Sequence, residues 1–392
     1  MSQQHLLGHT RPRVAAPMVG RDAQEPHRAS TPLELFFDLV FVVAVALAVD
    51  RLEHGIADGR VAASALSFAL VFFAIYWAWV NFTWFASAYD NDDLVFRLFV
   101  FATMVGALIF AAGVPRAFDE RDFAVVSVGY AVMRVALISQ WLRVAAEDSA
   151  HRLTARRFAT GLTVLQIGWL AALALPPPWW LVAWFVLAAG ELTVPIWGEA
   201  ASPTTWHAQH IAERYGLFMI IVLGESVLAA SAAIQVALAD GGLTGPLVPI
   251  IVGGLLILFS IWWIYFERPE DYMLSALPMA FVWSYLHLLV FASVAAVGAG
   301  LVVAIEGTAG DSALGPAATA ATVAVPFTIY LLSLWGMYVR RDEPGVRLFG
   351  VPITAAVVLA ASFTATPILL MGIAAAVLVA LKTALRLREQ SV

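Results

Sequence analysis

Carboxylates and one arginine within long apolar stretches are the residues of this sequence best placed to do chemistry. Glu34 and Asp38 lie in PLELFFDLVF, Arg134 lies in the middle of VGYAVMRVALISQW, and Glu225 follows Gly224 in LFMIIVLGES. A charged side chain at the centre of a bilayer costs about 2.5 to 3.5 kcal/mol on insertion scales. Such residues are therefore candidates for binding a proton or a substrate. Gly224 is expected to allow close helix packing around Glu225.

Glu34 and Asp38 are one helical turn apart, so their side chains share a face of the expected helix. Glu34 has a structural alternative, because Thr31 can cap this helix, Pro32 suits its first turn and the N-terminal dipole favours an acid. Asp38 lies deeper, among aromatic residues, and we interpret it as a candidate proton carrier. Its structural alternative is a carboxylate bonded to neighbouring backbone.

A second polar stripe begins in the segment WHAQHIAERYG. At about 100° per residue, His207, Arg214 and Glu225 project along one side of a helix, with His210 beside them. Arg214 therefore joins the candidate substrate or proton site. The histidine spacing also suits a metal ion, but a polar helix entry is the commoner use of such a cluster. His207, His210 and Glu213 are accordingly only weak candidates for metal ligands, and no metal is predicted.

Arg134 requires an anion, because it lies too far from either end of its span for the side chain to reach the interface. A guanidinium keeps its proton inside a protein, so its burial is offset by a carboxylate or by water. We expect Glu225, Glu191 and Asp38 as partners, in that order. The leading hypothesis places Arg134, Glu225, Asp38 and Glu34 in one polar site between two halves of the protein.

Four acidic or amide residues, Asp90-Asn91-Asp92-Asp93, separate two apolar stretches and precede Arg97. We expect a turn in which the acids cap the following helix and Arg97 folds back onto them. This cluster is therefore assigned a structural role.

The composition identifies the class of protein that must position these residues. Of 392 residues, 61% are hydrophobic and 13% charged, whereas soluble domains carry about 25% charged residues. Apolar runs of about 20 residues recur along the chain, and each is long enough to cross a bilayer core of about 30 Å. This predicts an all-α polytopic membrane helix bundle. No basic patch with interleaved aromatic residues indicates a nucleic-acid partner, and the absence of cysteine excludes disulfides and thiolate metal sites.

Charge clusters, prolines and glycines divide the chain into about twelve expected transmembrane helices. They cover residues 33–50, 61–85, 94–114, 123–142, 158–175, 179–197, 208–237, 247–266, 273–305, 316–339, 347–365 and 367–386.

Lysine and arginine residues indicate the orientation, because positively charged loops stay in the cytoplasm. With a cytoplasmic N-terminus, the outer face carries only Arg51, Arg60, Arg116 and Arg121. The inner face receives a larger set of cations, namely Arg11, Arg13, Arg21, Arg28, Arg143, Arg152, Arg156, Arg157, Arg340, Arg341, Arg347, Lys382, Arg386 and Arg388. We therefore predict a cell-membrane protein, the inner membrane in a bacterium, with both termini in the cytoplasm.

The chain is interpreted as a tail and two repeats. Residues 1–30 lack an apolar core and are expected to form a disordered basic cytoplasmic tail. WAWVNFTWF at 77–85 resembles WWIYFERPE at 262–270, which suggests a six-helix repeat over 31–200 and another over 206–388. Chance similarity between apolar helices is the alternative.

Four motifs together resemble the bacterial low temperature requirement A family. They are TPLELFFDLVFVVA, YWAWVNFTWFASAYDNDD, AAGVPRAF and ERYGLFMIIVLGES, in that order along the chain. The resemblance extends over most of residues 31–385. It implies a multi-pass membrane protein without an established molecular activity, and it carries over no catalytic residues.

Three functions remain open. A proton-coupled secondary transporter of a small solute is the leading hypothesis, because acids and an arginine lie within apolar spans. A membrane-embedded enzyme or cofactor protein using His207, His210 and Glu213 is the second, and a non-catalytic scaffold or sensor is the third. The sequence lacks P-loop, His-Glu-x-x-His and Gly-x-Ser-x-Gly motifs, so ATP-driven transport within this chain and familiar membrane hydrolases lose support. An enzyme is not favoured. The expected partners are the lipid bilayer and a small solute or proton, a homo-oligomer is left open, and no cofactor is identified.

Overall fold

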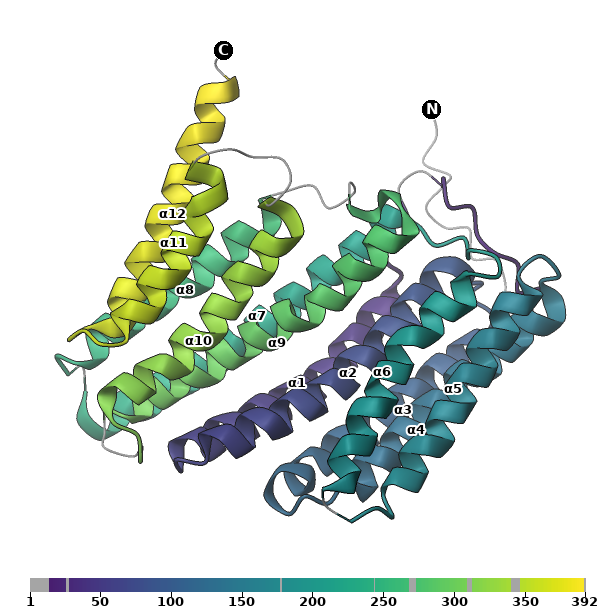
Figure 1. Cartoon of the computed structure of the whole chain (residues 1–392), viewed down its shortest axis with the longest axis horizontal. Coiled ribbons are helices and arrows are strands. Elements are labelled where there is room, and N and C mark those ends of the chain that lie inside the picture. The colour runs from purple at the N-terminus through teal and green to yellow at the C-terminus, as the bar shows by residue number, and fades with distance from the viewer. Residues whose placement is uncertain are drawn as a thin grey trace. The chain divides into compact units, whose positions relative to one another are not determined.

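The computed structural model describes residues 14–25, 28–176, 178–242, 244–267, 273–308, 312–339 and 346–390. Within these residues the chain is helical (Figure 1). Its α-helices are α1 (Pro32–Ala57), α2 (Val61–Tyr89), α3 (Leu94–Asp119), α4 (Ala124–Glu147), α5 (Arg152–Ala172), α6 (Trp179–Glu199), α7 (Ala208–Gly241), α8 (Leu247–Phe266), α9 (Leu277–Glu306), α10 (Pro316–Leu334), α11 (Val346–Ala361) and α12 (Pro367–Gln390). A 3₁₀ turn (Met273–Ser275) precedes α9, and a π turn (Trp335–Val339) extends α10.

The predicted all-helical membrane architecture is confirmed at this level. Among the described residues, 10 helices are long and apolar enough to cross a membrane, and α5 and α11 are not among them. α5 begins with Arg152, Arg156 and Arg157, which shorten its apolar part, and the apolar part of α11 spans only Leu348–Ala361. Twelve crossings therefore stay a prediction.

The chain divides into two compact units. The first contains residues 1–40, 78–113 and 123–211, and the second contains 41–77, 114–122 and 212–392. The α1, α2 and α3 helices each contribute to both units, because the boundaries fall inside them. The proposed repeats over 31–200 and 206–388 follow different boundaries, and the duplication stays a prediction.

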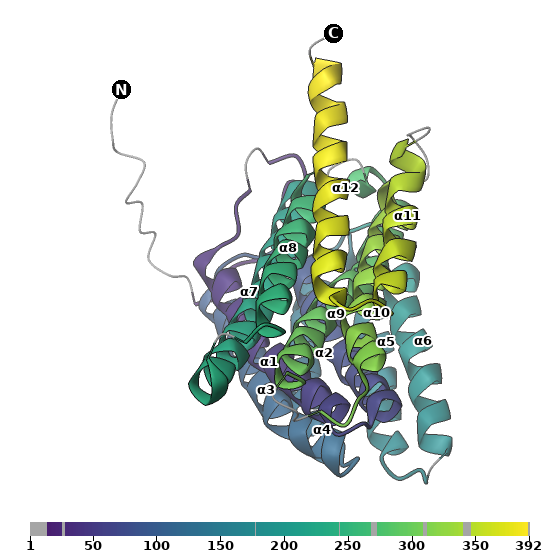
Figure 2. The same cartoon turned by 90° about the vertical axis from the view of Figure 1, so that its left-hand side faces the viewer.

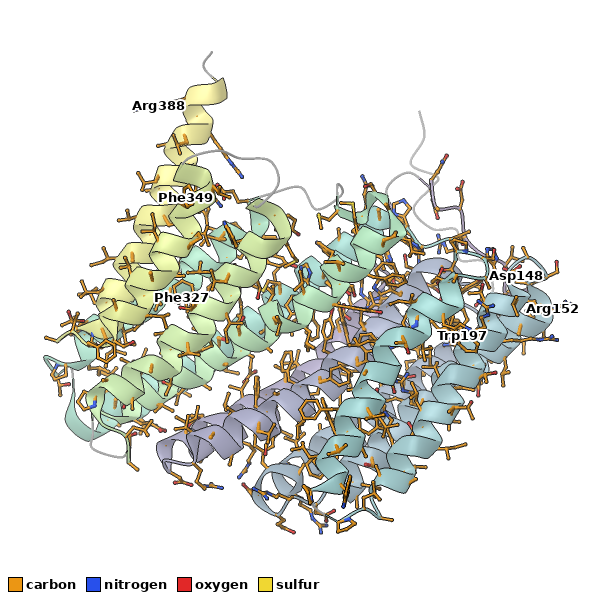
Figure 3. All side chains as sticks on the ribbon, in the orientation of Figure 1. Asp148, Arg152, Trp197, Phe327, Phe349 and Arg388 are labelled. Carbon is orange, nitrogen blue, oxygen red and sulfur yellow. The ribbon has the colours of Figure 1, made fainter. Side chains whose placement is uncertain are left out.

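In the first unit, α4 packs on α5 and α5 packs on α6, so these three helices lie side by side (Figure 1). Asp148 and Arg152 lie at the turn between α4 and α5, and Trp197 lies near the end of α6 (Figure 3). α3 and α4 approach so closely that a Cβ atom on Gly129 would lie 2.3 Å from the backbone nitrogen of Phe110. Only glycine fits there, because any side chain would meet backbone.

In the second unit, α9 packs on α10 and α8 packs on α12. α11 lies beside both α10 and α12, and Figure 2 shows α11 and α12 as adjacent helices. α8 and α12 meet at glycines, since a Cβ atom on Gly372 would lie 2.5 Å from the carbonyl oxygen of Gly253. Small residues allow these two backbones to touch.

The chain before α1 contacts the C-terminal end of α2. Arg28 is buried and donates from Nη2 to the carbonyl oxygen of Ala86 at 2.7 Å and from Nη1 to the carbonyl oxygen of Ser87. The backbone N–H of Arg21 donates to the carbonyl oxygen of Ala88 at 2.9 Å. The carbonyl oxygen of Ala86 also accepts the backbone N–H of Asp90 at 3.0 Å, so Arg28 adds a second donor there. The segment before α1 thus donates hydrogen bonds to the carbonyl groups of the last turn of α2.

Part of the segment expected to be a disordered tail is therefore in specific contact with the fold. Met18 is fully buried, which a solvated basic tail would not require. Residues 1–13, with Arg11 and Arg13, lie outside the described part of the chain, as do Arg340 and Arg341. The expected disorder stays a prediction for residues 1–13.

Candidate functional site

Glu34 forms a capping box at the start of α1. The backbone N–H of Thr31 donates to Oε2 of Glu34 at 2.8 Å, and the backbone N–H of Glu34 donates to Oγ1 of Thr31 at 3.3 Å. The structural interpretation of Glu34 is confirmed, because the two residues satisfy each other's open donors. The box uses one carboxylate oxygen and fixes the direction of the other.

His210 in the first turn of α7 lies beside that second oxygen. Its Nε2 is 3.1 Å from Oε1 of Glu34, and the side chains are 0% and 1% exposed. Two groups that each bind a proton therefore face one another with almost no water around them. An imidazole beside a carboxylate forms an ion pair when the imidazole is protonated, so the charge state of one depends on the other.

Asp38 lies in the next turn of α1 and is also 1% exposed. Its Oδ1 accepts a hydrogen bond from Nε1 of Trp79 at 2.7 Å. The ring of Phe37 packs on that of Phe82 with centroids 4.1 Å apart. The carboxylate is thus held by a side chain of α2 within an aromatic wall.

His207 has a structural role. Its Nδ1 accepts from the backbone N–H of His210 at 3.3 Å, and its Nε2 lies 2.8 Å from the carbonyl oxygen of Glu25, which accepts from it. Both ring nitrogens therefore bond backbone groups, and neither remains for a metal ion. Glu213 is exposed whereas His210 is fully buried. The geometry thus gives no support to a metal site formed by these three residues.

The sequence interpretation overlooked another polar group, formed by Asp50, Glu53 and His54 near the end of α1. One ligand atom from each lies within 4.8 Å of the others, which makes this the single three-residue metal-ligating arrangement among the described residues. The spacing i, i+3 and i+4 on one helix was the available signal. His54 Nδ1 is 2.7 Å from the carbonyl oxygen of Asp50, and Nε of Arg51 lies 3.3 Å from the Asp50 carboxylate, so two of the three side chains already have polar partners at this helix end.

Asp90 follows α2 and is buried beside the Glu34 region. Burial raises its pKa to about 6, and the negative charge of Glu34 contributes to the same rise. The Arg28 guanidinium opposes this shift. The charge state of Asp90, after the end of α2, therefore depends on Glu34 at the start of α1 and on Arg28 just before it.

The remainder of the acidic turn is structural, as expected. Asp93 accepts the backbone N–H of Phe96 at 2.6 Å and caps α3, while its Oδ2 lies 2.7 Å from Nη2 of Arg143. Asp92 pairs with Arg97 at 2.6 Å, so Arg97 folds back as predicted. The capping prediction is confirmed.

Arg134 is held by a carboxylate from another helix, which confirms that expectation. Its Nη2 lies 2.6 Å from Oε2 of Glu191 on α6, and the side chains are 3% and 1% exposed. The same nitrogen donates to the hydroxyl of Tyr130 at 2.5 Å, and Nε1 of Trp169 donates to Oε1 of Glu191 at 3.0 Å. The prediction that Glu225 is the first choice of partner was wrong, because the carboxylate that pairs with Arg134 is Glu191.

The remaining candidates lie on α7. Arg214 is fully buried, whereas Glu225 is half-buried. A Cβ atom added to Gly224 would meet nothing within 4 Å, so the expected close packing at this glycine is wrong. The predicted single site is also revised, since among the described residues Arg134 pairs with Glu191 and not with Glu34 or Asp38.

In the part of the chain that the structure describes, the all-helical fold with 10 candidate spans and buried ion pairs is that of a multi-pass membrane protein. Residues 29–383 match the family described as Bacterial low temperature requirement A protein (LtrA), and the chain belongs to this family. It is also similar to an uncharacterized protein of Rhizobium meliloti (strain 1021), at 28% identity over 278 residues. That match covers 67% of this chain and 66% of the relative, less than two thirds of the relative's length. No solved structure matches the chain.

Proposed function

We propose that this protein is a proton-coupled secondary transporter of a small solute, with Glu34 and His210 as the proton-binding pair. The observation that carries the proposal is the 3.1 Å approach of Oε1 of Glu34 to Nε2 of His210, with side chains 1% and 0% exposed. Both residues lie in candidate membrane spans. Unlike the guanidinium of Arg134, an imidazole can release its proton, so this pair can take up and release a proton. Buried ionisable groups in membrane spans commonly form proton relays.

Asp38 is the second proton-binding carboxylate in this proposal. Its partner Trp79 is an indole that donates one hydrogen bond and cannot accept a proton. The hydrogen bond therefore orients Asp38 in both of its charge states. Asp38 lies one turn deeper than Glu34 in α1, so the two acids form successive positions along one helix face.

Arg134 and Glu191 are assigned a structural role. The carboxylate accepts from both Arg134 and Trp169, and the guanidinium also donates to Tyr130. A buried pair with these additional hydrogen bonds fixes α4 against α6. Neither the comparisons nor the geometry at His207 favours the enzyme hypothesis over transport.

Proton flux in proteoliposomes tests the proposal. Purified protein would be reconstituted with a trapped pH indicator, and ammonium chloride, amino acids, short carboxylic acids and sugars would be added outside in turn. We expect at least one solute to change the internal pH, and Glu34→Gln and Asp38→Asn each to abolish that change. Asp58→Asn is the matched control, because Asp58 is exposed and its ion pair among the described residues is a local one with Arg60 at 2.8 Å.

Two results would overturn the proposal. One is a complete panel that moves no protons in the parent protein. The other is a solute-dependent proton flux that both Glu34→Gln and Asp38→Asn leave at the level of Asp58→Asn. Infrared difference spectra between pH 5 and 8 give an independent readout, because the carboxyl bands of the two acids should disappear in their own amide variants.

A further inference from the structure

A pocket of about 400 Å³ opens between the last turns of α8 and α12, within the second unit. Three aromatic rings form one part of its wall, from Trp262, Trp263 and Phe266. Thr383 and Arg386 of α12 form another part. An aromatic wall facing a cation and a hydroxyl is a combination that recognises an amphiphilic anion.

Among the described residues at this pocket, two cations lie close to one carboxylate. Oε2 of Glu267 is 2.6 Å from Nζ of Lys382, and its Oε1 is 3.2 Å from Nη1 of Arg386. One carboxylate therefore faces two cations. This carboxylate can balance only one of the two positive charges, so one positive charge is left over for a ligand.

Two donor groups remain for that ligand. Within the described residues, the contacts of Arg386 all use Nη1, which also donates to the carbonyl oxygen of Glu267 at 2.8 Å. Its Nε and Nη2 form the planar fork that matches a phosphate group. The Oγ1 of Thr383 is buried and lacks a hydrogen-bond partner among the described residues. A buried hydroxyl without a partner is costly, and a phosphate oxygen would satisfy it.

The position of the pocket along its helices points to the source of such a phosphate. α8 and α12 are both candidate membrane spans, and the pocket lies where both end. Trp262 and Trp263 are 48% and 45% exposed, as expected for rings at the level of lipid headgroups. Basic pockets between spanning helices at this level bind anionic headgroups.

We propose that this pocket binds the headgroup of an anionic phospholipid. The phosphate lies against Arg386 and Thr383, and the glycerol and first acyl carbons lie against Trp262 and Phe266. The bound lipid then fastens the end of α12 to α8. This site is separate from the Glu34 and His210 pair and does not depend on the transport proposal.

Thermal denaturation of the full chain in detergent tests the site. Phosphatidylglycerol, phosphatidylcholine and inorganic phosphate would be titrated in parallel, and the unfolding midpoint would be measured. We expect phosphatidylglycerol to raise the midpoint, and Arg386→Gln and Thr383→Val each to weaken its apparent affinity about tenfold. Arg388→Gln is the matched control, because Arg388 is an exposed cation near the end of the same helix (Figure 3) and should respond like the parent.

Thr383→Val still tests the site if Arg386→Gln fails to fold. Valine preserves the shape of threonine and removes an unpartnered hydroxyl, so this variant should be as stable as the parent without lipid. An unchanged response of Thr383→Val and Arg386→Gln to phosphatidylglycerol would overturn the proposal. Equal stabilisation by phosphatidylcholine would show that charge is not recognised, and equal stabilisation by inorganic phosphate would identify a free anion as the ligand.

Discussion

The guanidinium of Arg134 keeps its charge in an apolar surrounding, so its energy depends on the residues that compensate it. Glu191 supplies the opposite charge at 2.6 Å, and Tyr130 adds a hydroxyl acceptor. Removing one partner of a buried pair leaves the other charge without compensation, which costs about 3 to 5 kcal/mol. Removing both avoids the unpaired charge, so single and double changes are not additive.

We predict that Arg134→Gln and Glu191→Gln each destabilise the protein by about 3 kcal/mol and that the double variant recovers part of the loss. The measurement is thermal or denaturant unfolding of the three variants in one detergent. The idea fails if Arg134→Gln is as stable as the parent. It also fails if the two single losses simply add in the double variant.

Asp90 represents the opposite case, an acid whose environment disfavours its charge. Its pKa is raised to about 6 by burial and by Glu34, so the folded state binds the proton more tightly than the unfolded state does. The stabilising contribution of this proton is fully present below pH ~4, the ordinary aspartate range, and is lost as the pH rises through ~6. Asp90 should therefore reduce stability at neutral pH.

We predict that Asp90→Asn raises the unfolding free energy at pH 7.5 by about 1 to 3 kcal/mol and flattens its dependence on pH between ~4 and ~6. Unfolding midpoints from pH 4 to 8 would measure both effects. The exposed control Asp58→Asn should leave the profile unchanged. A variant that is less stable at every pH would mean that ionised Asp90 serves chiefly as a partner of Arg28.

Residues differ in how far their contacts could be predicted from the sequence. The Thr31 and Glu34 capping box is local, and its pattern S/T-x-x-E is visible directly. The approach of His210 to Glu34 joins residues far apart in the chain, and hydropathy carries no information on which helices become neighbours. The same limit explains why the need of Arg134 for a carboxylate was predicted while the preferred acid was not.

Helices were predicted more reliably than their ends. The first span was expected over 33–50, whereas α1 extends over Pro32–Ala57. Its final turns contain Asp50, Glu53 and His54, which are polar yet helical. Hydropathy detects residues that belong in hydrocarbon, and a helix continues beyond them until its hydrogen bonding stops.

The glycines at which α8 and α12 cross lead to a prediction about how these two helices pack. A larger side chain at Gly253 would meet the backbone of α12, since its Cβ atom would lie 2.4 Å from the carbonyl oxygen of Ile368. Gly253→Leu should therefore separate α8 from α12 and lower the unfolding midpoint strongly. Gly224→Ala is the matched control, because nothing lies within 4 Å and alanine favours a helix by about 1 kcal/mol. Equal tolerance of both changes would contradict this packing.

At the scale of the whole molecule, the number of crossings determines where the loops lie. If the N-terminus is cytoplasmic, as predicted, and α5 and α11 both cross, the loops after α6 and α10 face the cytoplasm, and Arg340 and Arg341 obey the positive-inside rule. If neither crosses, both loops face outward and these arginines break the rule. With the predicted cytoplasmic N-terminus, the loop after α4 is cytoplasmic in both arrangements, and the loop after α1 is external in both.

We predict twelve crossings with both termini in the cytoplasm, and Ala200 at the end of α6 reports whether α5 is one of them. The chain contains no cysteine, so a single introduced thiol reports one position without background. Ala200→Cys in intact cells should resist a membrane-impermeant maleimide until the membrane is permeabilised, because its loop should face the cytoplasm. Ser149→Cys is the cytoplasmic control and Asp58→Cys the external one, and Ala200, Ser149 and Asp58 are all exposed. Labelling of Ala200→Cys in intact cells, at the rate of Asp58→Cys, would mean that α5 does not cross.

Labelling of Ser149→Cys in intact cells would instead overturn the orientation assigned from the positive charges.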